Sequence, residues 1–385
     1  MTTPIVNTHV HVPPNFSAFT SPEDVVETAR AEGVRAIGIS NFYDQQVYGR
    51  FAELCRAAGI VPLFGLEFIT LVPDLEAAGI RVNDPANPGR MYVCGKGMDP
   101  FREKSASAAA TAAEIREGND ARASVMMQRL DAHLQDAGLP TRLTADATAA
   151  DVAARGGVPT AWVSLQERHI ARAVEEAVSA MPADGRAAVL AKAYGGPPKA
   201  SLDDPVGMQG EVRSRLLKVG TPGFAPEVPL SFESAYAYVL AMGGIPCYPT
   251  LADGVSPVCP FEEPAAELAA RLVERGIHLA ELIPIRNASA VVDEYVAAFR
   301  AAGIEVVAGT EHNTADRIPF DPACTDGPMS EFARAEFWRG TCIVAAHQAR
   351  VAAGRPGYVD AEGAVASDVE ELVREGAAII GGVEE

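Results

Sequence analysis

Apolar runs and amphipathic segments alternate along the first part of the chain. Residues 4–12 form an apolar run that is typical of a buried strand. Ser21-Pro22-Glu23-Asp24 then supplies the N-cap, the first-turn proline and the acidic residues with which helices begin. We therefore expect a helix over residues 22–32, which Gly33 ends.

The same alternation continues for two more strands. Residues 35–41 predict a strand, a helix follows to residue 58, and residues 61–68 predict a third strand. A strand–helix–strand–helix–strand order indicates parallel strands with the helices packed outside them.

This order returns in the second half of the chain, with strands apolar enough to be buried on both faces. We expect these strands at residues 243–249, 278–285 and 304–310, and helices between them at 263–275 and 288–302. The intervening residues 101–229 are rich in alanine and helical in pattern. We interpret residues 101–229 as an inserted helical subdomain, and residues 1–100 and 230–385 as the two parts of one α/β domain. Polar residues recur at the carboxyl ends of several strands, which favours a TIM-like (β/α) barrel over an open sheet.

Charge and cysteine content narrow the classes of function. The 51 acidic residues outnumber the 32 lysines and arginines, giving a net charge of -19, which disfavours extended nucleic-acid binding. A small anionic substrate is compatible with this charge if a metal ion or local arginines reverse the sign in one pocket. The six cysteines form no C-x-x-C pair, and no run of about 18 apolar residues or leader pattern is present. We expect a cytoplasmic protein with reduced thiols and no membrane association; an oligomer is compatible with the sequence.

The residues with the clearest chemical signal are His9 and His11. Residues i and i+2 of a strand face the same side, so both imidazoles can reach one metal ion. Glu67 closes the third predicted strand, where a buried carboxylate needs a cation. Glu311 and His312 follow the last apolar strand and can serve as a metal ligand and as an acid or base.

The order of these motifs resembles the PHP family, the polymerase and histidinol phosphatase domain, and within it the nucleoside-bisphosphate phosphatase group with a helical insert. The segments that carry the resemblance extend along most of the chain. They are His9-Val10-His11 for the opening H-x-H, Ser21 to Asp24 for the first helix start, Gly65-Leu66-Glu67 for Gly-x-Glu, Arg168 to Arg172 for a segment of the insert, Pro226 to Pro229 with Gly243-Gly244 for the return to the barrel, and Glu311 for the Asp of the final Asp-x-His. The resemblance implies a distorted barrel of about seven β/α units with a metal cluster at the carboxyl ends of its strands.

Several family ligands are replaced in this chain. Asn15, Phe42, Tyr92, Tyr248 and Asn313 stand at or near positions where the family has acidic or histidine ligands. The four donors that remain, His9, His11, Glu67 and Glu311, suffice for one Zn²⁺, Mn²⁺ or Fe²⁺ ion. We therefore expect about one divalent ion per chain, with Tyr92 and Tyr248 as hydrogen-bonding groups in the vacated volume.

The resemblance implies a metal-dependent phosphoesterase that acts on a small phosphorylated substrate through a metal-bound hydroxide. In this interpretation His312 or His169 protonates the leaving oxygen, and Arg286 and Arg168 bind the phosphate with their planar guanidinium groups.

Two alternatives stay open. An amidohydrolase-type C–N hydrolase also opens with H-x-H, but usually needs a bridging lysine at a strand end, where only Lys96 lies among the five lysines. The other is a catalytically degenerate PHP-like protein that binds a ligand without turnover.

Overall fold

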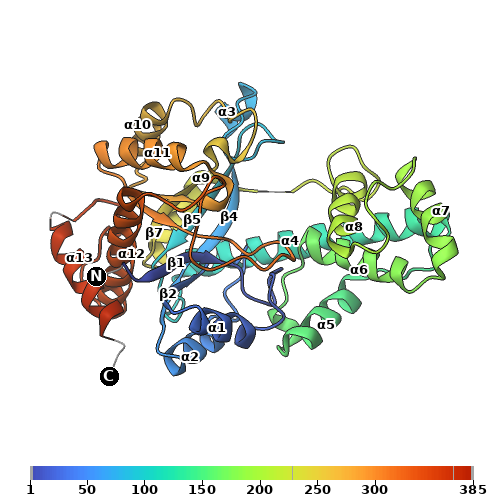
Figure 1. The fold of residues 1–385 in the computed structure, drawn as a ribbon, viewed down its shortest axis with the longest axis horizontal. Helices are drawn as coiled ribbons and strands as arrows, with labels where there is room; N and C mark the ends of the chain where they lie inside the picture. The colour runs from blue at the N-terminus through green and yellow to red at the C-terminus, as the bar shows by residue number, and fades with distance from the viewer. Residues whose placement is uncertain (1–2, 228, 367, 383–385) are drawn as a thin grey trace.

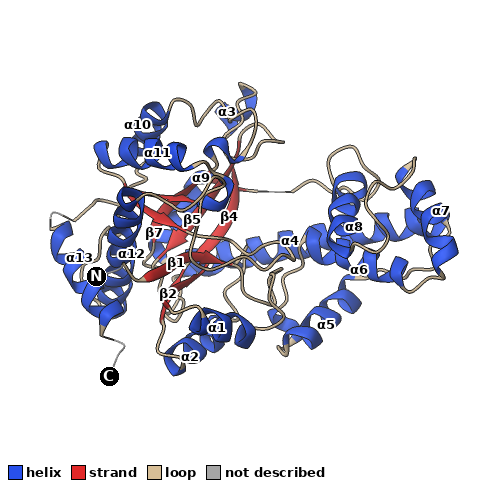
Figure 2. Cartoon of the chain, viewed as in Figure 1, coloured by secondary structure: helices blue, strands red, loops and turns tan. Residues whose placement is uncertain are grey.

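The computed structural model describes residues 3–227, 229–366 and 368–382, which form a mixed α/β protein (Figures 1 and 2). The mixed α/β class expected from the sequence is confirmed. The strands are β1 (Ile5–Val10), β2 (Val34–Ile39), β3 (Val61–Phe64), β4 (Leu66–Leu71), β5 (Arg90–Lys96), β6 (Leu230–Ser231), β7 (Ile245–Thr250), β8 (Leu279–Leu282) and β9 (Glu305–Ala308). The helices that cover them are α1 (Pro22–Ala31), α2 (Tyr48–Ala57), α3 (Pro73–Ala77), α9 (Phe232–Ala241), α10 (Ala265–Glu274), α11 (Ser289–Ala301), α12 (Glu331–Ala352) and α13 (Val369–Gly381).

The first sheet follows the sequence prediction closely. Strands β1, β2 and β3 pair in parallel in that order, and α1 and α2 connect them. Ser21 caps α1 by accepting a hydrogen bond from the backbone N–H of Asp24, as its position before Pro22 predicts. The valines of α1 pack on the isoleucines of β2 in one apolar core.

The second sheet differs from the expected seven-unit parallel barrel. It has the order β6-β4-β5-β7-β8-β9, in which β5 runs antiparallel to both of its neighbours. The connection from β4 to β5 contains only the short helix α3, so it does not form the helical crossover that parallel neighbours need. Within the described ranges the strands form two sheets rather than a single closed barrel.

The strand expected at residues 61–68 is divided between the two sheets at Gly65. A Cβ atom at Gly65 would lie 2.7 Å from the backbone oxygen of Gly95, so only glycine allows the chain to cross at this point. Isolated β-bridges join Phe42 to Glu67 and Val10 to Glu311, at the two places where the sheets meet. These junctions bring the ends of β1, β4 and β9 together.

Helices between Ala106 and Val212 form a separate group on the right of Figure 1. They are α4 (Ala106–Ala137), α5 (Ala145–Gly156), α6 (Glu167–Ser179), α7 (Ala183–Tyr194) and α8 (Pro205–Val212). The first turns of α4 pack against β4 and α9, while its later turns form an apolar core with α6 and α8. Helix α4 therefore connects the sheets to the helical group.

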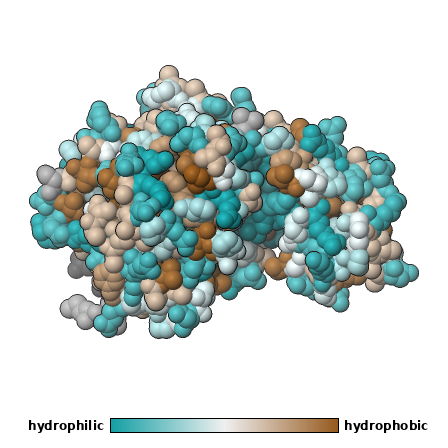
Figure 3. Space-filling view, turned by 90° about the horizontal axis from the view of Figure 1, so that it is seen from above, coloured by the Kyte–Doolittle hydropathy of each residue, from teal (hydrophilic) through white to brown (hydrophobic). Residues whose placement is uncertain are grey.

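Helices α12 and α13 pack together against the outer face of the sheets at the left of Figure 1. None of the helices described has the length and apolarity needed to cross a bilayer. On the face shown in Figure 3, hydrophilic side chains dominate and apolar ones occur in small, scattered patches.

Candidate metal centre

The imidazoles of His9 and His11 lie side by side at the carboxyl end of β1. Their ring centroids are 5.2 Å apart and both side chains are buried. The Nε2 atom of each ring is buried and has no hydrogen-bond partner among the residues that the structure describes. Because a buried polar atom without a partner is costly, two such atoms side by side indicate a missing ligand.

His9 is oriented by Glu281 on β8, a residue that the sequence analysis missed. The Nδ1 atom of His9 lies 2.6 Å from one Glu281 oxygen, and the ammonium of Lys96 lies 2.7 Å from the other. Burial alone would raise the pKa of Glu281, but Lys96 and His9 outweigh it and lower the pKa to about 2. An ionised carboxylate can only accept, so Nδ1 of His9 carries a proton and Nε2 is the ring nitrogen that a metal ion can bind.

Asn15 orients His11 through its Nδ1 atom, as Glu281 orients His9. Nδ1 of His11 lies 2.9 Å from the Asn15 Oδ1 atom, which acts as the acceptor, and Nε2 faces a Glu67 oxygen at 3.5 Å. Burial, followed by the neighbouring His9, lowers the pKa of His11 to about 3. His11 therefore stays neutral near pH 7, as a metal ligand must.

Glu67 on β4 completes a group of donors around one point. Ligand atoms of His9, His11 and Glu67 all lie within 4.8 Å of one another. Burial and the nearby carboxylates of Glu311 and Glu281 raise the pKa of Glu67 to about 7. Two imidazole nitrogens with free lone pairs and one carboxylate suit a divalent transition-metal ion, so the residues present fit such an ion.

Glu311, the fourth predicted ligand, lies beside this group without belonging to it. Its carboxylate pairs with the guanidinium of Arg286, with an Nη1–Oε1 distance of 3.1 Å, and accepts a hydrogen bond from Asn313. Burial favours its neutral form, but Arg286 outweighs burial and holds the pKa of Glu311 below its ordinary value. Glu311 and His312 both have positive φ angles, 60° and 53°, a strained conformation of the kind that clusters at functional sites.

The two histidines predicted to be catalytic lie outside the lining of the cavity above the metal group. Both ring nitrogens of His312 are occupied, by the Thr310 hydroxyl and by the backbone oxygen of Ile318, each at 2.8 Å. The Nδ1 atom of His169 accepts from the backbone N–H of Gln166 and thereby caps α6. His312 and His169 thus hold a loop and a helix end in place. Neither is positioned to donate a proton to a group in this cavity.

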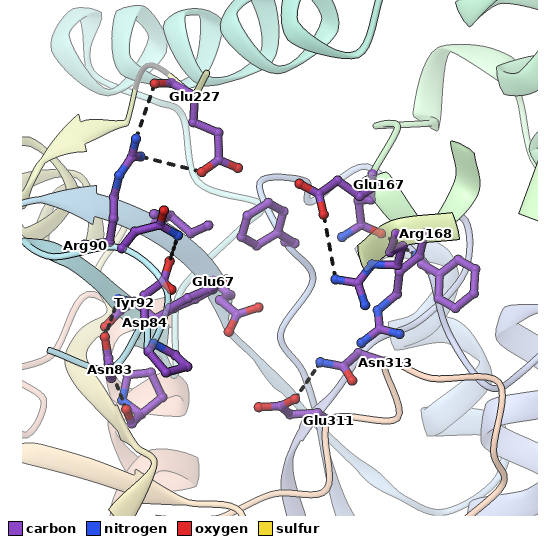
Figure 4. A pocket seen from close by; sticks show the side chains of 18 of the residues that line it. Glu67, Asn83, Asp84, Arg90, Tyr92, Glu167, Arg168, Glu227, Glu311 and Asn313 are labelled. Atoms are coloured by element: carbon purple, nitrogen blue, oxygen red, sulfur yellow. Dashed lines mark hydrogen bonds and ion pairs between the residues drawn. The ribbon is translucent and has the colours of Figure 1, made fainter. Parts of the chain in front are cut away.

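The cavity has a volume of about 460 Å³ and is lined by both the sheets and the helical group (Figure 4). Glu67 and Glu311 point into it, with Tyr92 and Asp84 on one side and Arg168 on the other. Tyr248 is placed elsewhere: it is fully buried and donates a hydrogen bond to Glu262 at 3.0 Å. Of the predicted substrate-binding residues, the structure thus brings Arg168, Arg286 and Tyr92 to the cavity.

Arg168 differs from the other cationic side chains of the cavity. Arg90, Arg122, Arg213, Lys218 and Arg286 each form an ion pair with Glu167, Glu227 or Glu311. Among the described residues Arg168 has no ion pair, and its guanidinium carbon lies 5.8 Å from the centroid of the Phe16 ring. Burial, followed by the nearby Arg213, lowers the pKa of Arg168 to about 10, so it remains charged at pH 7.

Gln166, which precedes α6, connects the helical group to the metal group. Its side-chain oxygen accepts from the backbone N–H of Phe16 at 2.6 Å, and its amide donates to Asn15 at 3.0 Å. The same Asn15 oxygen also accepts from His11 and from the backbone N–H of Phe42. The sequence contains no motif that signals this connection.

Comparisons with known proteins support the fold. No family model matches the chain, and no curated protein matches its sequence. A solved structure from Bifidobacterium adolescentis, of a protein proposed to be a metal-dependent phosphoesterase, has a TM-score of 0.58 at 15% identity and covers 87% of this chain and 96% of its own. An amidohydrolase from Chromobacterium violaceum, solved with bound sulfate and no metal, has a TM-score of 0.54 at 16% identity and covers 86% of this chain and 96% of its own. At these identities the likeness establishes a shared fold.

Proposed function

We propose that this protein is a metal-dependent hydrolase of small phosphate esters that uses one divalent ion held by His9, His11 and Glu67. The observation that carries the proposal is the pair of buried Nε2 atoms beside the Glu67 carboxylate, neither of which has a hydrogen-bond partner in the ranges that the structure describes. The fold likeness to a protein proposed to be a metal-dependent phosphoesterase supports the same class. Membership in the PHP family, with a barrel opened into two sheets and residues 101–229 as its inserted subdomain, is part of this proposal.

Held by these three residues, a divalent ion would supply a Lewis acid for the group to be hydrolysed and a water of lowered pKa. Glu281 and Asn15 hold the two imidazoles so that their lone pairs converge. Glu311 lies next to the donors and is kept ionised by Arg286, so it can orient a water or complete the ligand set.

Arg168 is the residue that we assign to substrate binding. Its guanidinium lines the cavity, is charged and has no carboxylate partner in the described part of the chain, so it can bind phosphoryl oxygens in bidentate fashion without breaking an ion pair seen there. The helical group supplies Arg168 and closes one side of the cavity, which limits the access of bulk water. We place the reaction in the cytoplasm, in keeping with six cysteines that are free and buried.

A C–N hydrolase is the second candidate, because an amidohydrolase shares the fold. Against it, Lys96 is engaged with Glu281 and with the backbone oxygen of Thr8, so its nitrogen is not free to bridge metal ions. A binding protein without turnover would also use the cavity, but it would not need a metal ion.

The test combines metal analysis with a substrate panel. Purified protein should contain about one divalent ion per chain and hydrolyse p-nitrophenyl phosphate or a nucleotide bisphosphate in preference to cyclic amides. His9→Ala should remove both the metal and the activity. His278→Ala, a change to a half-buried histidine at the start of β8, should keep both. Full metal content and activity in His9→Ala would contradict the proposal.

A further inference from the structure

Lys96 is a fully buried lysine that lies next to the metal group without facing the cavity. It ends β5 and is only 2% exposed. Its ammonium lies 2.7 Å from a Glu281 oxygen and 3.0 Å from the backbone oxygen of Thr8. Burying an ammonium group is costly unless it is paired, so this position calls for an explanation.

The contacts of Glu281 show where the charge of Lys96 acts. Glu281 has no exposed area, and its oxygens contact Lys96, Nδ1 of His9 at 2.6 Å and the Thr8 hydroxyl at 3.0 Å. With Lys96 beside it, Glu281 is an acceptor only, so Nδ1 of His9 must carry the proton. The other nitrogen of the ring, Nε2, is the buried atom for which the described residues supply no hydrogen-bond partner.

The surroundings of Lys96 also resemble a second cation site. His9, Cys94 and Glu281 form a second group of donors whose ligand atoms lie within 4.8 Å of one another. The ammonium of Lys96 already neutralises the carboxylate of this group. A lysine in this place supplies a permanent positive charge and so removes the need for another ion.

We propose that Lys96 is a positioning residue whose ammonium takes the place of a second cation and, through Glu281, fixes the tautomer and direction of the metal-binding His9. The inference rests on the metal site proposed above. It differs from a purely structural role, in which Lys96 would only join strands of the two sheets, because it predicts a change at one ring nitrogen of His9.

The test measures directly which ring nitrogen of His9 is protonated. In metal-free protein at pH 8, long-range ¹H–¹⁵N spectra of labelled histidine should show His9 protonated at Nδ1 and unprotonated at Nε2. The double variant Lys96→Met/Glu281→Leu removes both charges together, so it leaves no unpaired buried charge and should fold. It should populate the Nε2–H form and bind Zn²⁺ about 10–100-fold more weakly, as expected when an outer hydrogen-bond partner is lost.

The matched control is Arg300→Met, which removes a cation from the buried Glu305 at the far end of β9, where the Nη1–Oε2 distance is 2.7 Å. It should change neither the His9 spectrum nor the Zn²⁺ affinity. An Nε2–H form of His9 in the wild-type protein, or an unchanged spectrum and Zn²⁺ affinity in the double variant, would overturn the proposal. If the tautomer changes as expected but wild-type protein binds no Zn²⁺, the positioning of His9 is supported and the metal site of the proposed function is contradicted.

Discussion

Gly309 lies directly against His9. A Cβ atom at Gly309 would be 2.3 Å from the Cβ atom of His9, closer than real side-chain atoms approach. Gly309 follows β9 and its backbone N–H bonds to Leu282 on β8, so its position is fixed by the sheet. Only a glycine at position 309 therefore leaves room for His9 where the structure places it.

Gly309→Ala should displace His9 and weaken metal binding by at least about tenfold, because misplacing one ligand loses most of its contribution. It should also destabilise the metal-free protein by about 1–3 kcal/mol through overpacking. Calorimetric titration with Zn²⁺ and thermal unfolding measure the two effects. Gly49→Ala on α2, where an added Cβ meets nothing within 4 Å, should leave both unchanged or raise stability slightly. Normal Zn²⁺ affinity in Gly309→Ala would show that His9 is not a ligand.

Metal binding should release a proton from Glu67 under acidic conditions. Burial raises its pKa in the metal-free protein to about 7, and a ligand carboxylate must be ionised. At pH 6 we expect about one proton released per ion, and affinity that rises with pH until it levels above about pH 7. Titrations in two buffers with different ionisation enthalpies measure the proton count. An affinity that does not vary between pH 5.5 and 8 would contradict this role of Glu67.

The same shift predicts how Glu67 affects stability without metal. The pKa of Glu67 in the folded protein lies above its ordinary value of 4.5. The stabilising contribution of Glu67 to the free energy of unfolding is therefore fully present below pH 4.5 and is lost as the pH rises through about 7. In metal-free protein, kept so by a chelator, Glu67→Gln should therefore raise the free energy of unfolding at pH 8 by on the order of 2 kcal/mol. The same change should abolish metal binding. Denaturant unfolding of the wild type and the variant, with a chelator present, measures the effect on stability at pH 5 and at pH 8. A variant that is less stable than wild type at pH 8 would contradict the argument.

The sequence predicted those elements whose local signals agree with their surroundings. The helix start at Ser21-Pro22 and the parallel order of β1 to β3 follow from capping and apolar patterning, and the structure has both. The antiparallel strand β5 is not among the predicted strands, although Asn87-Pro88-Gly89 just before it is a turn signal, because its direction depends on pairing with β7, which is distant in the sequence. The break at Gly65 was missed as well, since the close approach to Gly95 depends on a strand that is distant in the sequence.

The two cavity arginines should respond differently to substitution. Arg168→Gln removes a cation that forms no ion pair with any described residue, so it should raise KM for a phosphate ester about tenfold and leave stability nearly unchanged. Arg286→Gln leaves Glu311 buried without its guanidinium, so it should cost about 3 kcal/mol in stability. Steady-state kinetics and thermal unfolding of both variants make the comparison. An unchanged KM in Arg168→Gln would assign phosphate binding to another residue.

The candidate site was predicted in part, and the missing part has a common cause. His9, His11 and Glu67 were found because strand alternation and strand ends can be seen in a single segment. In the sequence Glu281 is a single acid in an apolar run, and Lys96 stands near a strand end without any pattern that pairs it with Glu281. Their roles depend on a contact between β5 and β8 that no local pattern specifies. The sequence pattern around His312 predicts an acid, but it does not specify the contacts with Thr310 and Ile318 that occupy both ring nitrogens.

Asn15 provides the last prediction, since one oxygen of its side chain accepts from His11, from the backbone of Phe42 and from Gln166. Asn15→Ala should free the His11 ring and lower Zn²⁺ affinity about 10–100-fold, whereas Asn15→Asp keeps an acceptor and should bind Zn²⁺ more tightly than the alanine variant.

Gln166→Ala should have a smaller effect on Zn²⁺ affinity but should speed hydrogen exchange at the start of α6, because the helical group then loses a direct bond to the metal group. Gln135→Ala on α4 removes a comparable amide far from the cavity, where Gln135 bonds to Asp131, and serves as the control. If Asn15→Ala and Gln135→Ala bind Zn²⁺ equally well, the orientation of His11 does not depend on Asn15, and the connection from the helical group to the metal group has no role in binding the ion.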